Sequence, residues 1–248
     1  MSALAAALRH ATFFDVSPCL DGTTAVFPGH PEVTIDRTAR THERDGYFLQ
    51  HLAFGEHTGA HVDAPAHARA DLATRTIDTY HVARFVAPYA KYDLSAEALS
   101  PGSLVTRAQL EAAEQAAEVP RPGDIALLQF GWDRHRRDGS ADPDERSWWI
   151  RNAPGLDADA CALLVERGVS GVGSDTATCD AATVDGTIVS AVGHERLLLP
   201  NDILLFESLT GLARVPSRGI FVGLPLAIRG GSGSPIRAIV IAEQEEGA

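Results

Sequence analysis

Three histidines and one aspartate occur close together in this chain, in the segment HTGAHVDAPAH at residues 57–67. Imidazole nitrogens and carboxylate oxygens are the usual ligands of Zn²⁺, Mn²⁺ and Fe²⁺ in hydrolytic sites. The alternative is that these are ordinary surface or core histidines that contact no metal. The density of the cluster, interrupted by Gly59 and Pro65, favours a metal site.

The spacing of these residues also predicts their geometry. On a straight strand at about 3.3 Å per residue, His57 and His61 would lie roughly 13 Å apart, near the limit for binding one ion. A turn at Gly59 would shorten this distance, because glycine adopts backbone angles that other residues avoid. Asp63 follows His61 at the spacing of two that places side chains on the same face of a strand.

Three weaker candidates lie far downstream. Glu207 ends the apolar run 203–206, and a buried carboxylate needs a partner, either a metal ion or an arginine such as Arg214. His194 stands in the polar segment 193–196, and Asp175 follows an expected strand at a place where α/β sheets commonly present site residues. By themselves these residues do not decide between a site and a structural role.

The elements that must position these residues alternate between strand and helix signals. A capping-box pattern begins at Thr106 and predicts a helix to Glu118, and Asp157 caps a second helix that ends at Gly168. The polar segment 134–146 is expected to be a surface loop. We expect strands at residues 12–17, 47–54, 125–130, 169–173, 203–207, 219–224 and 236–242, with the second leading into the histidine segment. These signals predict a single α/β domain over residues 1–248.

Composition excludes several classes of function. The chain has 248 residues and a formal net charge of −12, which disfavours nucleic acid and anionic membranes as partners. We find neither a signal peptide nor a long apolar segment, and the three cysteines form no CxxC pair. We therefore expect free thiols and a cytoplasmic protein, with Cys179 as a buried thiol rather than an activated nucleophile.

The chain resembles the cyclase family of metal-dependent hydrolases, which includes kynurenine formamidase and isatin hydrolase. The family pattern His-x-Gly-Thr-His-x-Asp-x-Pro-x-His matches residues 57–67, with Ala60 in place of the usual threonine. Similarity extends from about Asp15 to Ala242. Weaker matches, in the family's order, are Gly55-Glu56, Gly131-Trp132, Asp175-Thr176, His194, Glu207 and the tail 225–237, which contains Gly231-Ser232-Gly233-Ser234-Pro235.

The resemblance implies a fold and a site. The fold would be an α/β swivelling domain of the β/β/α type with a mixed central sheet. One or two divalent ions per subunit, Zn²⁺ or Mn²⁺, would be held by His57, His61, Asp63, His194 and Glu207, with His67 as proton donor and acceptor. The family also implies a homodimer or homotetramer with a small-molecule substrate.

The implied reaction is hydrolysis of a C–N bond in a small amide, either opening a cyclic amide or cleaving an N-formyl arylamine. A bound dication acidifies a water molecule and polarises a carbonyl, which supports such chemistry independently. Phe27, Trp132 and Asp175 are expected to contact the substrate. Phe27 replaces a tryptophan common in relatives, and Gln129 and Ala227 replace cations, so no one family substrate transfers directly. The alternatives are a lactone hydrolase, a cyclase-dehydratase and a non-catalytic metal-stabilised binding protein.

Overall fold

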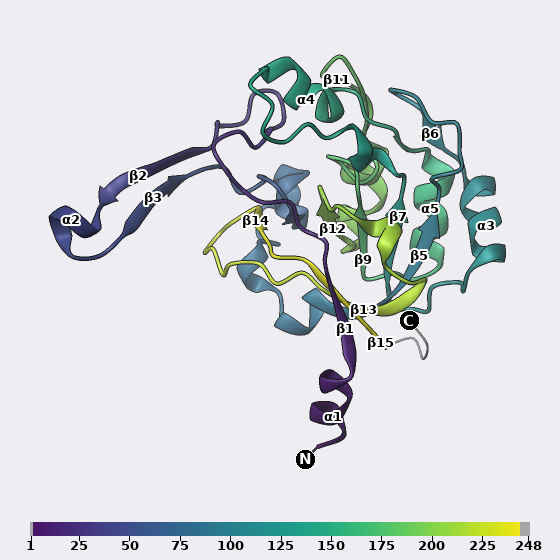
Figure 1. Ribbon diagram of the computed structural model, residues 1–248. Helices are drawn as coiled ribbons and strands as arrows, with labels where there is room; N and C mark the ends of the chain where they lie inside the picture. Colours follow the sequence, from purple (N-terminus) through teal and green to yellow (C-terminus); the bar gives the residue numbers. More distant parts are fainter. Residues whose placement is uncertain (1, 244–248) are drawn as a thin grey trace.

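The fold is built on a nine-stranded mixed sheet, seen in the computed structural model, which describes residues 2–243 (Figure 1). In this sheet β5, β7, β9 and β12 are parallel neighbours, and the other strand pairs of the sheet are antiparallel. In spatial order the strands are β1 (Ala11–Asp15), β15 (Ile239–Glu243), β13 (Arg218–Val222), β5 (Val86–Asp93), β7 (Ile125–Gln129), β9 (Gly171–Ser174), β12 (Leu204–Glu207), β4 (His61–Asp63) and β14 (Gly233–Pro235). The predicted α/β fold with a mixed central sheet is confirmed.

The central strands are apolar along their whole length because both of their faces are covered. In β7, Ala126 and Leu128 belong to one hydrophobic cluster, whereas Ile125 and Leu127 belong to a second cluster on the opposite face. Successive side chains of a strand point to opposite faces, so a strand covered on both sides has no polar alternation. This explains the continuous apolar run that identified β7 in the sequence.

Helices cover one face of the sheet through Leu110, Trp149 and Leu164, which join the first cluster. Thr106 and Gln109 form the expected capping box, and Asp157 caps the second expected helix, so both predicted helix starts are confirmed. The α-helices are α1 (Ala3–Arg9), α2 (His42–Asp45), α3 (Arg107–Ala116), α4 (Pro143–Arg151) and α5 (Ala158–Glu166). Short 3₁₀ turns span Pro65–His67, Ala70–Leu72, Ile77–Thr79, Val82–Phe85, Trp132–His135, Leu199–Asn201 and Leu212–Arg214, and a π-helical turn spans Gly193–Leu197.

One local prediction is confirmed and another is wrong. The segment 47–54 contains the expected strand, β3 (Leu49–Ala53), which pairs with β2 (Thr34–Arg40) outside the central sheet in a hairpin that projects from the body (Figure 1). The segment 134–146 is not a loop throughout, because Asp142 caps α4 and Pro143 occupies its first turn, where proline is favoured. Two smaller pairs are β10 (Ala182–Val184) with β11 (Thr187–Ser190), and β6 (Leu104–Val105) with β8 (Gly155–Leu156).

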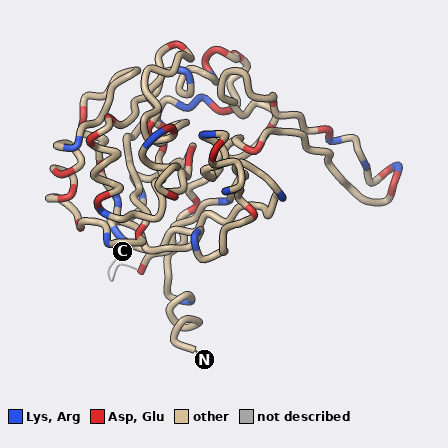
Figure 2. The backbone as a smooth tube through the Cα atoms, turned by 180° about the vertical axis from the view of Figure 1, so that it is seen from behind, with Lys and Arg blue, Asp and Glu red and all other residues tan. Residues whose placement is uncertain are grey.

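The other expected strands lie in the central sheet and correspond to β1, β7, β9, β12, β13 and β15. Acidic and basic residues are interspersed over the body and along the β2–β3 hairpin (Figure 2). Within residues 2–243, no helix has the length and apolar character needed to cross a membrane. The feature that matters most for function is the antiparallel pairing of β12 with the short strand β4.

Candidate metal centre

The pairing of β4 with β12 brings the two halves of the predicted site together. In this register His61 lies opposite Glu207, and Asp63 lies opposite Leu205, so the polar side chains share one face of the sheet. His61 Nε2 is 3.3 Å from Glu207 Oε2 and 3.4 Å from Asp63 Oδ1. Asp63 and Glu207, which are 144 positions apart in the sequence, thus lie on two neighbouring short strands.

The turn expected at Gly59 is present and has the expected effect. Gly59 has a φ of +62°, in the left-handed region that favours glycine. The rings of His57 and His61 lie 5.3 Å apart between centroids, and both contact Asp63 Oδ1. The sequence-based geometry of this segment is confirmed.

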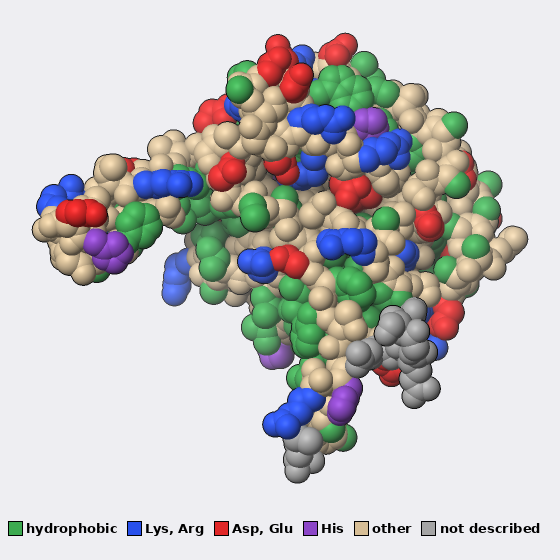
Figure 3. All heavy atoms as spheres, in the orientation of Figure 1, with side chains coloured by type: hydrophobic (Ala, Val, Ile, Leu, Met, Phe, Trp, Pro, Cys, Tyr) green, Lys and Arg blue, Asp and Glu red, His purple; other side chains and the backbone are tan. Residues whose placement is uncertain are grey.

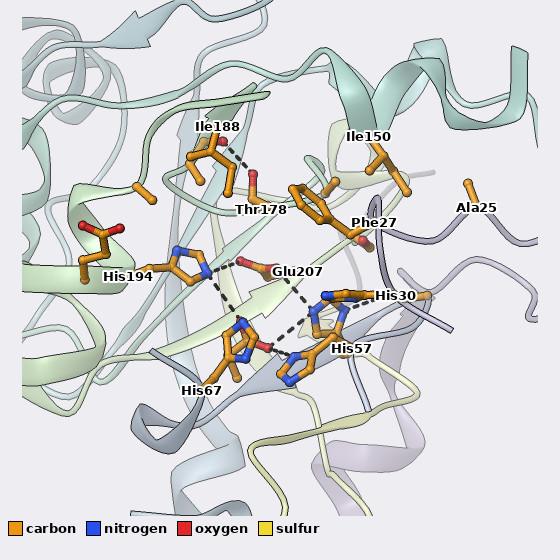
Figure 4. A pocket seen from close by; sticks show the side chains of 18 residues that line it. Ala25, Phe27, His30, His57, His67, Ile150, Thr178, Ile188, His194 and Glu207 are labelled. Carbon is orange, nitrogen blue, oxygen red and sulfur yellow. Dashed lines mark hydrogen bonds and ion pairs between the residues drawn. The ribbon is translucent and has the colours of Figure 1, made fainter. Parts of the chain in front are cut away.

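Two further histidines complete the cluster (Figure 4). His194, on the π-helical turn, places Nε2 3.5 Å from Asp63 Oδ2 and 3.4 Å from Glu207 Oε1. His67, at the end of the turn Pro65–His67, places Nε2 3.9 Å from Asp63 Oδ2. Asp63 therefore lies at the centre of the cluster.

Each of three histidines has one ring nitrogen held by a neighbour and the other directed at the carboxylates. His61 Nδ1 is 2.8 Å from the carbonyl oxygen of Gly59, and His194 Nδ1 contacts Asp180 Oδ1. His57 Nε2 is 2.9 Å from Ser232 Oγ, whereas its Nδ1 is 2.5 Å from Asp63 Oδ1. Metal-binding histidines in proteins are held in this way, by a second partner that fixes the orientation of the ring.

The carboxylates fit a cation better than any partner that they have in the structure. Asp63 and Glu207 are both buried, and Asp63 Oδ2 has no hydrogen-bond partner among residues 2–243 although it is shielded from solvent. The predicted alternative partner, Arg214, instead donates to the backbone oxygen of Asp15. Since an unpaired buried carboxylate oxygen is costly, the donor set and its unsatisfied oxygen fit a divalent ion.

The charges of the metal-free cluster are set by mutual attraction. Burial favours neutral groups, but Asp63 and Glu207 outweigh it and raise the pKa of His61 to about 9. Asp180, with Asp63 and Glu207, likewise raises the pKa of His194 well above its usual value against the effect of burial. The histidines in turn hold the pKa of Asp63 and Glu207 below their usual values, although burial opposes this.

His67 has the opposite tendency. Burial lowers its pKa, the neighbouring imidazoles of His57 and His194 add to this, and Asp63 opposes it only in part. At neutral pH the His67 ring is therefore neutral and can accept a proton, in contrast to His61 and His194.

The ligand atoms form two groups that share Asp63. One group is His61, Asp63 and Glu207, and the other is His57, Asp63 and His67, with all ligand atoms of a group within 4.8 Å of one another. His57 and His61 thus belong to different groups. His67 lies close enough to His57 and Asp63 to be a ligand itself. Either group could hold one divalent ion, and Asp63 belongs to both groups.

The cluster lies at the base of a cavity of about 270 Å³ whose opposite wall is apolar (Figure 4). Phe27 belongs to this wall, as expected from the sequence. The other apolar lining residues are Ala25, Ile150, Ala177, Ala181, Ile188 and Ala191. Among the described residues that line the cavity, none is lysine or arginine.

Trp132 and Asp175 do not line this cavity, which corrects the prediction that they contact substrate. The indole of Trp132 is buried, and its Nε1 donates to the backbone oxygen of Trp149. The buried carboxylate of Asp175 accepts the N–H groups of Phe130 and Gly131 at 2.8 Å. Asp175 holds the turn that follows β7, and Trp132 joins this turn to α4. Both contacts support the fold and not the binding of a substrate in this cavity.

Cys179 is also structural in its contacts. Its buried thiol lies near the backbone oxygens of Val172 and Phe206, and burial raises its pKa well above the usual value. Its backbone N–H donates to Glu207 Oε1 at 2.9 Å. The prediction of a buried thiol is confirmed, and its backbone helps to orient Glu207.

Sequence reasoning missed several residues that contact the site. His30 lines the cavity, 5.7 Å from the ring of Phe27 and 6.2 Å from that of His57. Because His30 follows Phe27 by three residues, its place in the sequence could have identified it as a candidate for the pocket. Asp180 gave no such signal, and Ser232 was noted only as part of the tail pattern without a role, because each reaches its histidine only through the tertiary fold.

The chain is similar to known proteins over most of its length. Residues 12–181 match the model of the Cyclase family, described as "Putative cyclase". The chain is 31% identical over 219 residues to an isatin hydrolase of Roseibium aggregatum, covering 85% of this chain and 81% of that protein. It is 29% identical over 230 residues to a kynurenine formamidase of Salinibacter ruber, covering 91% and 95%.

Solved structures show the same architecture. An isatin hydrolase bound to the product analogue thioisatinate superposes with a TM-score of 0.83 at 28% identity, covering 98% of this chain and all of that chain (100%). Isatin hydrolase A from Ralstonia solanacearum gives a TM-score of 0.78 at 29% identity, covering 97% and 96%.

Proposed function

The chain belongs to the cyclase family, and from this premise we propose that it is a metal-dependent amidohydrolase acting on the C–N bond of a small amide. The preferred substrates are a cyclic amide fused to an aromatic ring or an N-formyl arylamine. The relatives named isatin hydrolase and kynurenine formamidase support this reaction class.

One observation carries the proposal. A buried carboxylate pair, Asp63 and Glu207, lies among oriented imidazoles at the base of a cavity that is open to a small molecule. A purely structural ion would need to be enclosed by protein ligands on all sides, whereas a catalytic site keeps an open position. The non-catalytic alternative is therefore the weaker one.

The residues of this chain divide into three tasks. His57, His61, Asp63, His194 and Glu207 would hold the metal, which when bound would polarise the amide carbonyl and acidify a water molecule. His67, neutral at pH 7, accepts a proton at Nε2 and returns it to the leaving nitrogen. The wall that contains Phe27 holds the apolar part of the substrate and excludes water.

The identity and number of the ions are part of the proposal. Nitrogen and oxygen ligands suit both Zn²⁺ and Mn²⁺, and the two ligand groups that share Asp63 support occupancy by one or two ions. Metal analysis of protein purified without added metal, and after loading with each ion, measures both quantities. A cytoplasmic location likewise remains a proposal, supported by three unpaired cysteines.

A homodimer or homotetramer is also proposed. At the start of β3 and in the connection before it, Tyr47, Phe48 and Leu49 are about half exposed, at 52%, 50% and 52%. Hydrophobic side chains are visible on the surface of the β2–β3 hairpin (Figure 3). An isolated two-stranded hairpin is marginally stable in water, so contact with a second copy would stabilise it. Light scattering on the wild type and on Phe48→Ser tests this proposal, and a monomeric wild type contradicts it.

The activity is tested with a panel of isatins, N-formyl arylamines and lactones, assayed with Zn²⁺ and with Mn²⁺. We expect metal-dependent hydrolysis of at least one amide class, lost on chelation and restored by metal. Hydrolysis of lactones alone would instead favour the lactonase alternative. Absence of turnover with all three classes in the metal-loaded protein would contradict the proposed reaction.

A further inference from the structure

The glycine- and serine-rich tail segment has a specific contact with the metal cluster. Gly233 packs against the ring of His57 so closely that a Cβ there would lie 2.6 Å from His57 Cε1 and 2.7 Å from the backbone oxygen of Val62. A Cβ on Gly231 would lie 3.0 Å from Glu56 Oε1. The two glycines therefore let Ser232, between them, approach both Glu56 and His57.

Ser232 connects Glu56 to His57 through a short chain of hydrogen bonds. Glu56 Oε2 accepts the backbone N–H of Ser232 at 2.9 Å and its hydroxyl at 2.8 Å. Ser232 Oγ lies 2.9 Å from His57 Nε2. Neither Glu56 nor Ser232 was assigned a role by the sequence or by the proposed reaction.

The direction of these hydrogen bonds follows from the chemistry of the groups. An ionised carboxylate only accepts, so the single hydrogen of the Ser232 hydroxyl is donated to Glu56. Ser232 Oγ can then act only as an acceptor toward His57, which must carry a hydrogen on Nε2. The neutral form of His57 is therefore the Nε2–H tautomer, with a free lone pair on Nδ1.

The lone pair on Nδ1 of His57 faces a carboxylate oxygen. Nδ1 of His57 lies 2.5 Å from Asp63 Oδ1, which is also an acceptor. Two acceptors this close repel each other, and a divalent ion beside them would offset this repulsion. His61 and His194 have the reverse arrangement, with Nδ1 held by a neighbour and Nε2 directed at the carboxylates.

We infer that Glu56 and Ser232 are positioning residues that fix His57 in the Nε2–H tautomer, so that Nδ1 is the nitrogen it offers to the metal. This inference rests on the proposed metal site but not on the identity of the substrate. It predicts mixed ligation, through Nδ1 of His57 and through Nε2 of His61 and His194.

Nitrogen NMR of the zinc-loaded protein tests the tautomer directly. In protein labelled with ¹⁵N-histidine and saturated with Zn²⁺, we expect the His57 ring to show a protonated Nε2 and a metal-bound Nδ1. A protonated Nδ1 with a zinc-bound Nε2 would overturn the inference. No substrate is present in this experiment, so its result is independent of whether the panel above shows turnover.

Substitutions test whether the two residues cause this arrangement. Ser232→Ala should weaken zinc binding by about 10–100-fold, the usual effect of removing a partner that orients a metal ligand. Ser232→Thr keeps the hydroxyl and should restore most of the affinity. Glu56→Gln introduces an N–H donor that can reverse the chain, so a second His57 tautomer should appear in the NMR spectrum.

Ser234→Ala is the matched control, because within residues 2–243 the hydrogen bonds of its buried hydroxyl are to the backbone of Leu226 and Pro235 and not to the histidine cluster. It should leave zinc affinity and the His57 tautomer unchanged even if it lowers the melting temperature. Equal losses of affinity in Ser232→Ala and Ser234→Ala, or wild-type affinity in Ser232→Ala, would reject a positioning role. If Ser232→Ala does not fold, Glu56→Gln and its NMR signature decide the question.

Discussion

Glu207→Gln removes one negative charge from the centre of the metal cluster while keeping the shape of the side chain. In the metal-free protein, Glu207 lies 3.3 Å from His61 Nε2 and 3.4 Å from His194 Nε2. Its carboxylate is buried, so solvent cannot replace the lost charge. The substitution therefore affects both zinc binding and the stability of the metal-free protein, in ways that can be separated.

The effect on zinc binding follows from the lost charge. Two unit charges 4 Å apart interact by about 4 kcal/mol at an effective dielectric constant of about 20, and a dication doubles this value. The amide oxygen of glutamine recovers part of that interaction. We expect the zinc dissociation constant to rise by at least about 10²-fold, or about 2.7 kcal/mol, in competition titrations with a chromophoric chelator.

The effect on the metal-free protein depends on pH. The pKa of His61 is raised from 6.5 to about 9, so the folded state is stabilised below pH 6.5 and this stabilisation is lost as pH rises through 9. A shift of this size is worth about 3 kcal/mol, which Glu207 shares with Asp63. Glu207→Gln should therefore lower the free energy of unfolding by about 1–2 kcal/mol near pH 6.5 and by little at pH 9.5.

Glu114→Gln provides the control for burying an amide in place of a carboxylate. Glu114 pairs with Arg167 at 2.9 and 2.7 Å and accepts the hydroxyl of Tyr92, all away from the metal cluster. Because Arg167 stays charged at both pH values, Glu114→Gln should lower the free energy of unfolding by a similar amount at pH 6.5 and at pH 9.5. The zinc affinity of this variant should be unchanged. Unaltered zinc affinity in Glu207→Gln, or a loss of stability that does not vary with pH, would refute the reasoning.

Three further predictions concern the same cluster. His61→Ala removes a ligand nitrogen and should lower metal content and activity together while most of the fold remains; full metal occupancy by elemental analysis would exclude His61 as a ligand. His67→Ala should retain metal and lose about 10²–10⁴-fold in turnover, measured at saturating substrate; loss of metal would make His67 a ligand, and unchanged turnover would remove it from the mechanism. Because His61 and His194 are protonated in the metal-free protein, zinc binding should release about two protons, and affinity should rise from pH 6 to 9; calorimetry in buffers of different ionisation enthalpy measures this release, and a pH-independent affinity would contradict the assigned charges.

The sequence by itself determined the features that depend on short-range geometry. Segment 57–67 holds its ligands within a few residues of one another, and the turn at Gly59 is a local property of glycine. Helices α3 and α5 were found because Thr106 and Asp157 cap their own first turns. The apolar run of β7 was recognisable because a strand buried on both faces has no polar alternation.

Other outcomes were decided only by the tertiary structure. The register of β4 against β12 joins Glu207 to His61, and the sequence alone left an arginine as an equal partner for Glu207. Trp132 and Asp175 do not line the cavity, and backbone groups of neighbouring segments satisfy their polar atoms. Neither outcome follows from local propensity, since each depends on which distant segment lies alongside.

The tail segment shows most clearly what cannot be predicted from the sequence alone. Ser232 lies 175 residues from His57, and only the approach permitted by Gly233 makes it a hydrogen-bond partner of that ring. The sequence determined which side chains could bind a metal, because that is a matter of chemical type and near spacing. The fold decided which nitrogen of each ring faces the metal, because that depends on long-range packing and on the donors and acceptors it brings into contact.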